Sequence, residues 1–489
     1  MSEIFSNDRP VLELLSKEKI ETIHISSLRI LEDVGIMVDN KNALKLFTEI
    51  GADVDTNKKI VYVPEYLVKE ALKKAPSSIK MYSRNRKFDM LLAKNKVYYN
   101  PGSAALYMLD RETGERRRPL SKDFREFVKL VDAMENIHAQ STAMVVSDVP
   151  EIVADRHRLY IVLKNSTKTI VTGAFTIEGI YDMKKMLEVV VGGEKELRKK
   201  PLAIFDVCPS PPLKWSEITS QNLIDCAKFE IPAEIIPMPQ VGATGPATLA
   251  GSLVQFNAEF LCGLVMSQMT KPGAPIIYGG SPAIVDMRTG TGRLAAIEAI
   301  MLCCAYAQIG KYYNLPTHAY LGLSDAKIID AQTGMEAALG LVLGALAGIN
   351  NIAGPGMLSF ENCQSFEKLV IDNEICGYAL RLVRGIQVNE ETLALDVIEK
   401  VGPGGHFLAQ KHTNKWFRIE EYMPSYVIDT RSERDWLEKG RKDIVQRAKE
   451  RVDEILKEYE PEPLPPDIEK ELDNVVVEFM EKHGVTKLP

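Results

Sequence analysis

The sequence predicts an α/β protein built on a (β/α)8 TIM barrel, and three observations support this fold class. From about residue 140, β-rich runs alternate with long helical runs at a spacing of roughly 35 residues, as barrel units require. Most of these runs are continuously apolar, which is typical of parallel strands buried on both faces. The helical runs between them are rich in Ala, Leu, Met and Gly, which suits close packing against a barrel wall.

Residues 1–139 are predicted to form an N-terminal helical and small β cap. Helical periodicity runs through residues 20–35 and 42–51, and each stretch ends at a glycine, a common helix stop. Residues 60–76 then predict a short strand and a helix. Residues 80–121 read as several short strands, with turn residues at ETGE.

Residues 140–424 are predicted to form the barrel. The eight strand candidates are STAMVVS (141–147), KTIVTGAF (168–175), LAIFDVCP (202–209), AEIIPMPQVG (233–242), APIIYGG (274–280), THAYLG (317–322), NNIAGPG (350–356) and, most weakly, GIQVN (385–389). Residues 425–489 are charged and helical around a PEPLPP turn, and predict a C-terminal helical extension. We expect this extension to pack on its own barrel, with a dimer arm as the alternative.

Composition excludes several partners. The net charge of -7 gives no basic field for nucleic acid. The seven cysteines are odd in number and form no CxxC pair, which indicates reduced thiols in a cytoplasm. The first 20 residues lack the pattern of a signal peptide, and the most apolar stretch, 337–349, is too short to cross a bilayer of about 30 Å. We therefore expect a cytoplasmic protein with no membrane partner.

Familiar catalytic signatures are absent from the sequence. It contains no HExxH, GxSxG or GxxxxGK[ST], no GxGxxG after a strand, and no Cys and His pairs with metal-ligand spacing. These absences argue against metalloprotease, α/β-hydrolase, P-loop and Rossmann functions. We expect no tightly bound metal.

Strand ends carry the candidate catalytic residues, because barrel active sites lie at the carboxyl ends of the strands. Glu234 begins an apolar strand, where a buried carboxylate needs a partner or a cationic ligand. His318 lies in THAYLG, and Asp325 and Lys327 follow that strand in LSDAK. The alternative for Asp325 and Lys327 is a helix cap and a surface ion pair.

Aromatic residues lie near the same strand ends. They are Tyr98, Tyr99, Tyr278, Tyr320 and Phe360. Aromatic faces attract quaternary ammonium groups by about 0.5–2 kcal/mol each, so several converging rings would form a cage. The alternative for each ring is a core residue whose hydroxyl bonds a backbone carbonyl.

With these residues in view, the sequence resembles the trimethylamine methyltransferase family, including its glycine betaine members. The resemblance covers nearly the whole chain and is carried by five stretches. They are SPPLKWSE (210–217), PMPQVGATGPATLAGSLVQFNAEFLCG (237–263), KPGAPIIYGGSPAIVDMRTG (271–290), LSDAKIIDAQTG (323–334) and SFEKLVIDNEI (365–375). It implies a barrel enzyme of anaerobic one-carbon metabolism that moves a methyl group from a methylated amine to the cobalt(I) of a corrinoid (cobalamin) carried by a separate protein.

The sequence departs from the trimethylamine branch, because that branch has a pyrrolysine at a strand end and every residue here is standard. This favours a quaternary amine such as a betaine, with trimethylamine or another methylated amine as the alternative donor. The resemblance then implies a trimethylammonium group caged by the five aromatic residues, with Glu234 or Asp325 offsetting its charge. His318 and Lys327 are the candidates for the far end of the substrate.

Two further readings stay open on the sequence. One is a barrel that binds a quaternary amine without turnover. The other is a lyase or isomerase that uses Glu234 and Lys327 as acid and base. The apolar, glycine-rich helices also favour a homo-oligomer.

Overall fold

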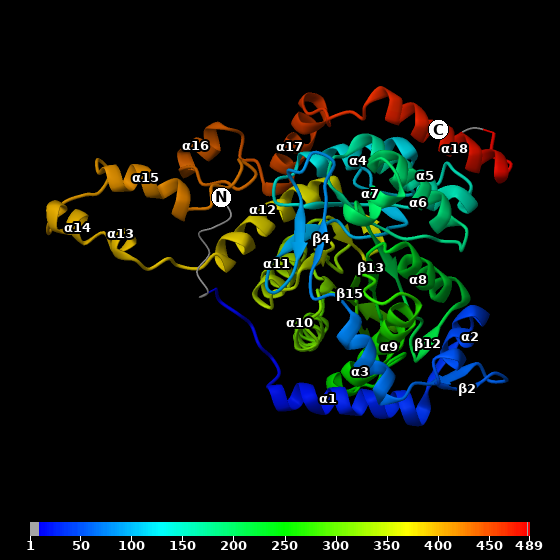
Figure 1. Ribbon diagram of the computed structural model, residues 1–489. Helices are drawn as coiled ribbons and strands as arrows, with labels where there is room; N and C mark the ends of the chain where they lie inside the picture. Colours follow the sequence, from blue (N-terminus) through cyan, green and yellow to red (C-terminus); the bar gives the residue numbers. More distant parts are fainter. Residues whose placement is uncertain (1–8, 487) are drawn as a thin grey trace.

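The computed structural model describes residues 9–486 and 488–489, so the first eight residues of the predicted cap lie outside the described residues. Parallel strands lie at its centre, with helices around them (Figure 1). Five strands form one sheet in the order β15-β13-β11-β10-β9. They are β9 (Ala139–Ser141), β10 (Thr169–Thr172), β11 (Ala203–Val207), β13 (Ala233–Ile235) and β15 (Ile276–Tyr278).

Three more parallel strands complete the ring: β18 (His318–Tyr320), β19 (Asn351–Ala353) and β6 (Tyr98–Asn100), in the order β18-β19-β6. A bridge between Tyr278 and Thr317 joins the two sheets on one side. On the other side β6 lies beside β9, where His138 N donates to Tyr99 O at 2.8 Å, although no continuous ladder joins these two strands. The predicted barrel fold is therefore confirmed.

The strand predicted at residues 385–389 is wrong, because these residues follow a helix and form no strand. Ile386 and Val388 are 82% and 73% exposed, so this run lacks the burial that stabilises a barrel strand. The eighth strand is instead β6, which comes from the N-terminal side of residue 139. The division into domains at residues 139 and 424 remains a prediction.

Helices surround the barrel (Figure 1). They are α4 (Ser121–Ala133), α5 (Glu151–Asn165), α6 (Gly179–Val191), α7 (Glu194–Lys199), α8 (Glu217–Phe229), α9 (Leu249–Thr270), α10 (Ile297–Tyr312), α11 (Ala331–Leu346) and α12 (Phe366–Val383). Within the described chain, α9 alone has the length and apolarity to cross a membrane, and 78% of its apolar window is buried inside the protein. It is the core helix against which α8 packs.

The N-terminal segment packs on the outside of α9. Its helices are α1 (Lys17–Arg29), which continues as a π-helix (Ile30–Val34), α2 (Lys41–Glu49) and α3 (Glu65–Lys74), and both α1 and α3 contact α9. Its strands are β1 (Ile36–Val38), β2 (Asp53–Asp55) and β3 (Ile60–Tyr62), which form a small sheet with β12 (Lys214–Trp215). The helical and β character expected for this segment is present.

A hairpin closes the amino-terminal end of the barrel. It consists of β4 (Ile79–Met81) and β5 (Met90–Leu92). Four of its side chains are buried against side chains from the barrel strands, among them Val171, Ile204 and Ile277. This end is filled by an apolar cluster.

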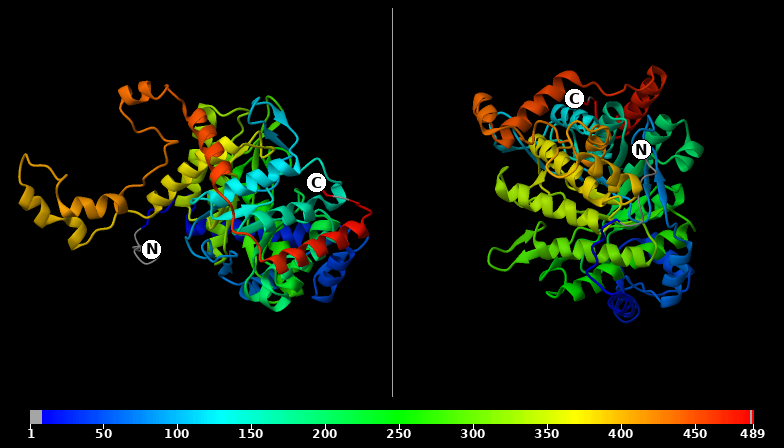
Figure 2. Two further views of the ribbon diagram at one scale, coloured as in Figure 1. Left: turned by 90° about the horizontal axis from the view of Figure 1, so that it is seen from above. Right: turned by 90° about the vertical axis from the view of Figure 1, so that its left-hand side faces the viewer.

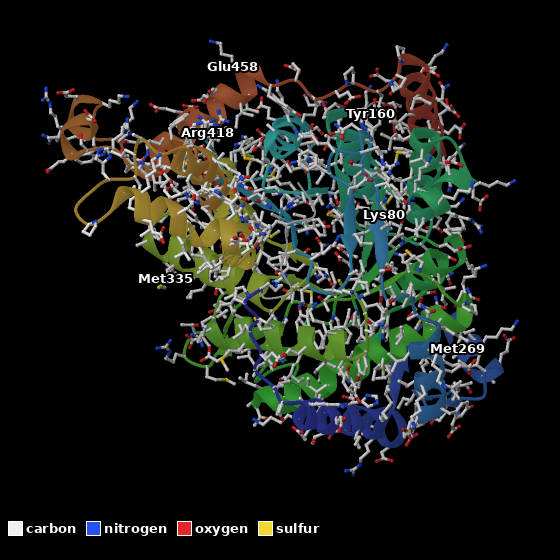
Figure 3. The ribbon with its side chains drawn as sticks, turned by 60° about the vertical axis from the view of Figure 1, so that its left-hand side comes forward. Lys80, Tyr160, Met269, Met335, Arg418 and Glu458 are labelled. Atoms are coloured by element: carbon white, nitrogen blue, oxygen red, sulfur yellow. The ribbon has the colours of Figure 1, made fainter. Side chains whose placement is uncertain are left out.

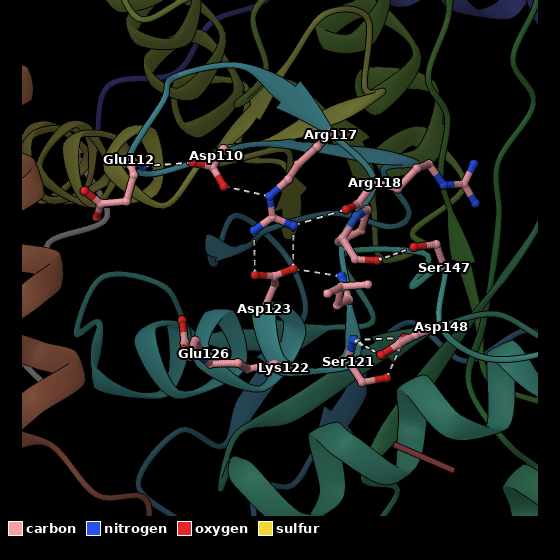
Figure 4. Close-up of polar contacts among 12 residues, drawn as sticks. Asp110, Glu112, Arg117, Arg118, Ser121, Lys122, Asp123, Glu126, Ser147 and Asp148 are labelled. Carbon is pink, nitrogen blue, oxygen red and sulfur yellow. Dashed lines mark hydrogen bonds and ion pairs between the residues drawn. The ribbon is translucent and has the colours of Figure 1, made fainter. Parts of the chain in front are cut away.

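Two small sheets flank the opposite end, which we call the mouth. One has the order β20-β21-β7-β8, from β7 (Tyr107–Leu109), β8 (Arg116–Arg117), β20 (Met357–Leu358) and β21 (Cys363–Gln364). The other contains β14 (Gln240–Val241), β16 (Ala283–Asp286) and β17 (Thr291–Arg293). Figure 4 shows how the β7–β8 hairpin is tied to α4: Arg117 donates to Asp110 at 2.7 Å and to both oxygens of Asp123 at 2.7 and 2.8 Å.

The C-terminal part divides into two kinds of structure (Figures 1 and 2). After α12, the short helices α13 (Glu390–Leu393), α14 (Leu395–Val401), α15 (Lys411–Glu420) and α16 (Glu433–Glu438) extend away from the barrel. The last two helices, α17 (Ile444–Glu458) and α18 (Pro466–Lys482), return to it, and they pack on α12 and on α6 respectively. From α17 onward the charged tail thus packs on its own barrel. α16 instead belongs to the projecting part, which begins at residue 385, some 40 residues before residue 425.

Candidate active site at the barrel mouth

Two acidic side chains lie next to each other inside the barrel. Asp206 and Glu234 are paired in register on the neighbouring strands β11 and β13. Glu234 is fully buried, and its Oε2 accepts a hydrogen bond from Asn351 Nδ2 at 3.1 Å. Burial and the neighbouring Asp206 hold the pKa of Glu234 well above its usual range, and burial also raises the pKa of Asp206. The upward shifts follow from placing two carboxyl groups side by side in a buried site, where both cannot easily carry charge.

His318 faces this acidic pair from β18. Its Nε2 lies 3.7 Å from Glu234 Oε1, and burial lowers the pKa of the imidazole to about 3, so the ring is neutral. Neither ring nitrogen has a hydrogen-bond partner among the residues described, and Glu234 Oε1 also has none. Buried polar atoms normally find partners in a native protein, so unpaired atoms gathered in one place indicate a ligand site.

Gly279 makes room for the histidine. A Cβ at this position would lie 3.1 Å from His318 Nδ1 and 2.8 Å from a backbone oxygen of β13. Tyr320 packs edge-on against the imidazole, with 5.1 Å between ring centroids. Its hydroxyl donates to Ser103 O at 2.8 Å, which ties the ring to the loop after β6.

Arg158 brings a positive charge to the same place from α5. It is fully buried, and its Nη2 donates to Ser103 Oγ at 3.1 Å and to the carbonyl of Thr142. Its Nε and Nη1 have no hydrogen-bond partner within the described part of the chain, and the guanidinium carbon lies 4.9 Å from the centroid of the Phe175 ring. Burial lowers the pKa of the guanidinium to about 10, and Asp155 and Asp206 oppose this shift, so the group stays cationic at neutral pH.

Glu361 reaches the mouth from a strained loop. Ser359, Phe360 and Glu361 have φ values of 52°, 61° and 63°, three successive left-handed residues without a glycine. Each costs about 1–2 kcal/mol, a strain typical of functional sites. The Oε1 of Glu361 accepts from Ser281 Oγ at 2.7 Å, and burial raises the pKa of this carboxyl to about 7.

Asp325 and Lys327 tie loops together. The Asp325 carboxylate accepts from the backbone N–H groups of Leu294 and Ala295 at 3.2 and 3.1 Å. Lys327 Nζ donates to the carbonyl of Asp325 at 2.7 Å and lies 4.1 Å from the centroid of the Phe360 ring. These contacts favour a structural part for the LSDAK loop, and the predicted roles of all three residues in catalysis or binding stay untested.

Three of the predicted aromatic residues lie elsewhere. Tyr98 packs at the amino-terminal end of the barrel, where its hydroxyl accepts from Leu91 N at 3.1 Å. Tyr99 points outward to α11, and its hydroxyl donates to Leu341 O at 3.4 Å. Tyr278 is buried towards α9 and donates to Asn257 Oδ1 at 2.8 Å. The five rings therefore do not surround one space, since side chains alternate between the two faces of a strand.

Of the residues at the mouth, the sequence analysis named Glu234, His318 and Tyr320 and did not name three others. Asp206 is the single charged residue in LAIFDVCP, so it could have been predicted as Glu234 was, from a charge within an apolar strand. Arg158 and Glu361 could not be predicted in this way, because Arg158 lies on a helix and Glu361 lies in a loop. In the described part of the chain, no group of three or more His, Cys, Asp or Glu residues is placed to hold a metal ion.

Known proteins resemble this chain along its whole length. Residues 1–484 match the family model described as trimethylamine methyltransferase. A trimethylamine methyltransferase of Desulfitobacterium hafniense is 36% identical, with 96% of this chain and 95% of the relative covered. A glycine betaine methyltransferase of Desulfitobacterium hafniense is 33% identical (95% and 96% covered), and a trimethylamine methyltransferase of Methanosarcina barkeri is 34% identical (95% and 94% covered).

A solved structure shares the fold. The crystal structure of the Methanosarcina barkeri monomethylamine methyltransferase superimposes with a TM-score of 0.53 at 11% identity, covering 90% of this chain and 88% of that one. At this identity the likeness concerns the fold alone.

Proposed function

The chain belongs to the trimethylamine methyltransferase family, and we propose that it takes a methyl group from a betaine, a quaternary amine with a carboxylate, and passes it to the cobalt(I) of a corrinoid on a separate protein. The chain is thus a methyltransferase. The observation that carries the choice of substrate is the pairing of a buried acidic site with a buried cation. Glu234 and Asp206 supply the acidic part, and Arg158 supplies the cation.

The acidic pair suits a trimethylammonium head. A quaternary ammonium has no N–H group to donate, so it is held by charge and by apolar contact. Placed beside Glu234 and Asp206, it would supply the positive charge that lets these buried carboxyl groups ionise. Neutral His318 adds no competing charge at this point. A site with this electrostatic balance favours a permanent cation over an uncharged amine.

Arg158 suits the other end of the substrate. A guanidinium with unpaired N–H groups binds a carboxylate strongly, and Nε and Nη1 of Arg158 have no partner in the described structure. The sequence had offered His318 and Lys327 for this part. Because His318 is neutral and Lys327 is engaged by the Asp325 carbonyl, Arg158 is the better candidate.

The proposed reaction depends more on aligning the substrate and excluding water than on acid or base catalysis. A corrinoid presented at the mouth by its own protein would supply, through cobalt(I), the electron pair that takes the methyl group, and the C–N bond pair would stay on nitrogen. The unpaired polar atoms of Asp206, Glu234 and His318 fit this chemistry, since they can hold a cation and need not transfer a proton. This chain therefore binds the substrate and orients one methyl group outward.

The proposal includes a cytoplasmic location. All seven cysteines are free, and six of them are buried, as expected for reduced thiols.

An anaerobic assay tests the function. The full chain is mixed with cobalt(I) cobalamin, free or on a carrier protein, and with a panel of methylated amines, and the absorbance change that accompanies methylation is followed. We expect turnover with a betaine. If no quaternary amine in the panel reacts or binds, while a glycine betaine methyltransferase reacts alongside, the proposed function is wrong. Binding without turnover would support the non-catalytic alternative.

The same assay tests the part given to Arg158. Arg158→Gln should raise KM for the betaine by about 10–100-fold, the range of a lost charged hydrogen bond, and leave a quaternary amine without a carboxylate unaffected. Arg118→Gln, at the exposed rim, serves as the matched control. An equal rise in KM for amines with and without a carboxylate would mean that Arg158 supports the fold and does not bind the substrate carboxylate.

A further inference from the structure

The segment from residue 385 to residue 423, which we call the arm, has no core of its own. It contains α13, α14 and α15, of 4, 7 and 10 residues, and none of its residues is buried. Isolated helices shorter than about 12–15 residues are marginal in water, and most helical stability in proteins comes from packing. The arm therefore needs a surface to lie on.

The arm is nevertheless anchored at its base. Arg381, near the end of α12, donates to Glu420 Oε2 at 2.7 Å and to the carbonyl of Gly385 at 2.9 Å. Arg384 donates to the carbonyl of Ile419. The two ends of the arm thus meet at one place, and the segment between them projects from the body (Figures 1 and 2).

The exposed side chains of the arm are large and apolar. They are Ile386, Val388, Leu393, Leu395, Ile398, Phe407, Leu408, Ile419 and Met423. Together they expose on the order of 700 Å², if a fully exposed apolar side chain presents roughly 120 Å². The largest apolar patch on a typical monomer is about 300–600 Å², and each partner in a stable interface buries about 800 Å². The arm alone nearly supplies one side of such an interface.

A second apolar surface lies next to the root of the arm. Met335 and Leu339 are exposed on α11, and Tyr378 and Leu382 are exposed on α12, which packs against α11. Both pairs have the i, i+4 spacing that places side chains on one side of a helix. We call this surface the α11–α12 face, and Figure 3 shows Met335 projecting from it.

These two surfaces cannot cover each other within one molecule, because the arm extends away from the body. Two copies related by a two-fold axis can cover both surfaces. Each arm then lies on the α11–α12 face of the other copy, and the same contact occurs twice. A segment without a core also needs a partner that is present whenever the chain folds, and another copy of the same chain meets that condition. We propose that residues 385–423 form an exchange arm that packs on the α11–α12 face of a second copy of this chain.

The mass of the full chain in solution tests the proposal. We expect an assembly of at least two 54.6 kDa copies by analytical ultracentrifugation. Leu408→Asp, at a side chain that is 86% exposed, should weaken assembly by at least 10-fold in Kd without loss of helical content. Ile25→Asp, at an exposed apolar residue of α1, should assemble as the wild type does. A monomeric wild type, or a Leu408→Asp variant that assembles unchanged, would overturn the proposal.

A cross-link between copies tests the receiving face. Chains with Leu408→Cys and chains with Met335→Cys, carrying different tags, are mixed and treated with a short bismaleimide. We expect a product that contains both tags, and no such product when Ile25→Cys replaces Met335→Cys. Assembly through the arm without any cross-link to residue 335 would show that the arm lies on a different face, which would contradict the second half of the proposal.

Discussion

The two ends of the barrel are built from the same strands and are opposite in character. At the amino-terminal end, the β4–β5 hairpin fills the space with apolar side chains. At the mouth, Glu234, Asp206 and His318 include polar atoms without partners among the described residues. On β11 the change occurs within two positions, from Ile204 to Asp206, both of which lie on the same face of the strand. Apolar packing is concentrated at one end, and polar atoms without hydrogen-bond partners among the described residues are concentrated at the other.

The contrast between the two ends of the barrel predicts which substitutions should affect activity and which should affect stability. Burying carboxyl groups beside each other opposes folding, whereas filling the other end with apolar side chains favours it. Variants of the mouth should therefore lose activity and keep or gain stability, and variants of the closed end should do the reverse. The predictions below test this contrast, beginning with the largest expected effect.

Glu234→Gln should lower kcat/KM for the betaine by about 100-fold, because an amide cannot ionise to balance the cationic head of the substrate. The same variant should melt at or above the wild-type temperature at pH 8, since the raised pKa of Glu234 means that its ionised form opposes folding there. Glu259→Gln is the matched control: Glu259 is also buried, with a pKa raised to about 7, but it lies on α9 and accepts from Leu213 N. Loss of activity in both variants would contradict a special role for Glu234.

Leu92→Ala should lower the free energy of unfolding by about 2–5 kcal/mol, because it opens a cavity in the apolar cluster at the closed end. kcat/KM per folded molecule should stay unchanged. Denaturant unfolding and the methyl-transfer assay measure the two quantities on the same preparation. A Leu106→Ala variant, at an exposed residue, should change neither. A fall in kcat/KM to match the fall in stability would mean that the two ends are coupled.

The pH dependence should have opposite signs for binding and for stability. Glu361 has a pKa of about 7, so it loses its proton as pH rises from 6 to 8, and a cationic substrate should then bind several-fold more tightly. A carboxyl with a raised pKa contributes most to stability below its usual value near 4.5, and that contribution is lost as pH rises through about 7. Glu361→Gln should flatten both profiles. KM and melting temperature between pH 5.5 and 8 provide the check, and an unchanged KM profile in the variant would assign the effect to other groups.

Lys327→Gln should have the smallest effect, at most about 3-fold in kcat/KM. Its ammonium is engaged by the carbonyl of Asp325 and the ring of Phe360, contacts that are worth about 1 kcal/mol together at an exposed site. Steady-state kinetics with the betaine measures the change. A loss above 10-fold would return Lys327 to the substrate site that the sequence predicted.

The sequence predicted six barrel strands in place because strands buried on both faces leave continuous apolar runs. A seventh, STAMVVS at 141–147, was placed late, since β9 is Ala139–Ser141. The prediction failed at the eighth, since YYN in β6 is short and lies among charged residues, while GIQVN has the right residue types but is exposed. Because β6 was not recognised as a barrel strand, Tyr98 and Tyr99 were both assigned to the mouth. Neighbouring residues of a strand point to opposite faces, so the two rings cannot lie together. Glu234 and His318 were predictable as polar residues within apolar strands. Glu361 was not, because Ser, Phe and Glu are not residue types that indicate a left-handed backbone.

The pairing of β6 with β19 also sets the order in which the molecule can be completed during synthesis. Tyr98 of β6 pairs with Asn351 of β19. β6 is therefore synthesised early but cannot pair with β19 until most of the chain has been made. Such distant pairing is slow, and an unpaired strand edge is open to association with other chains. The hairpin that closes the amino-terminal end is made just before β6 and has nothing to close until the ring exists. We therefore expect nascent chains that end before residue 353 to depend on chaperones, and the barrel to form only after most of the chain has been released.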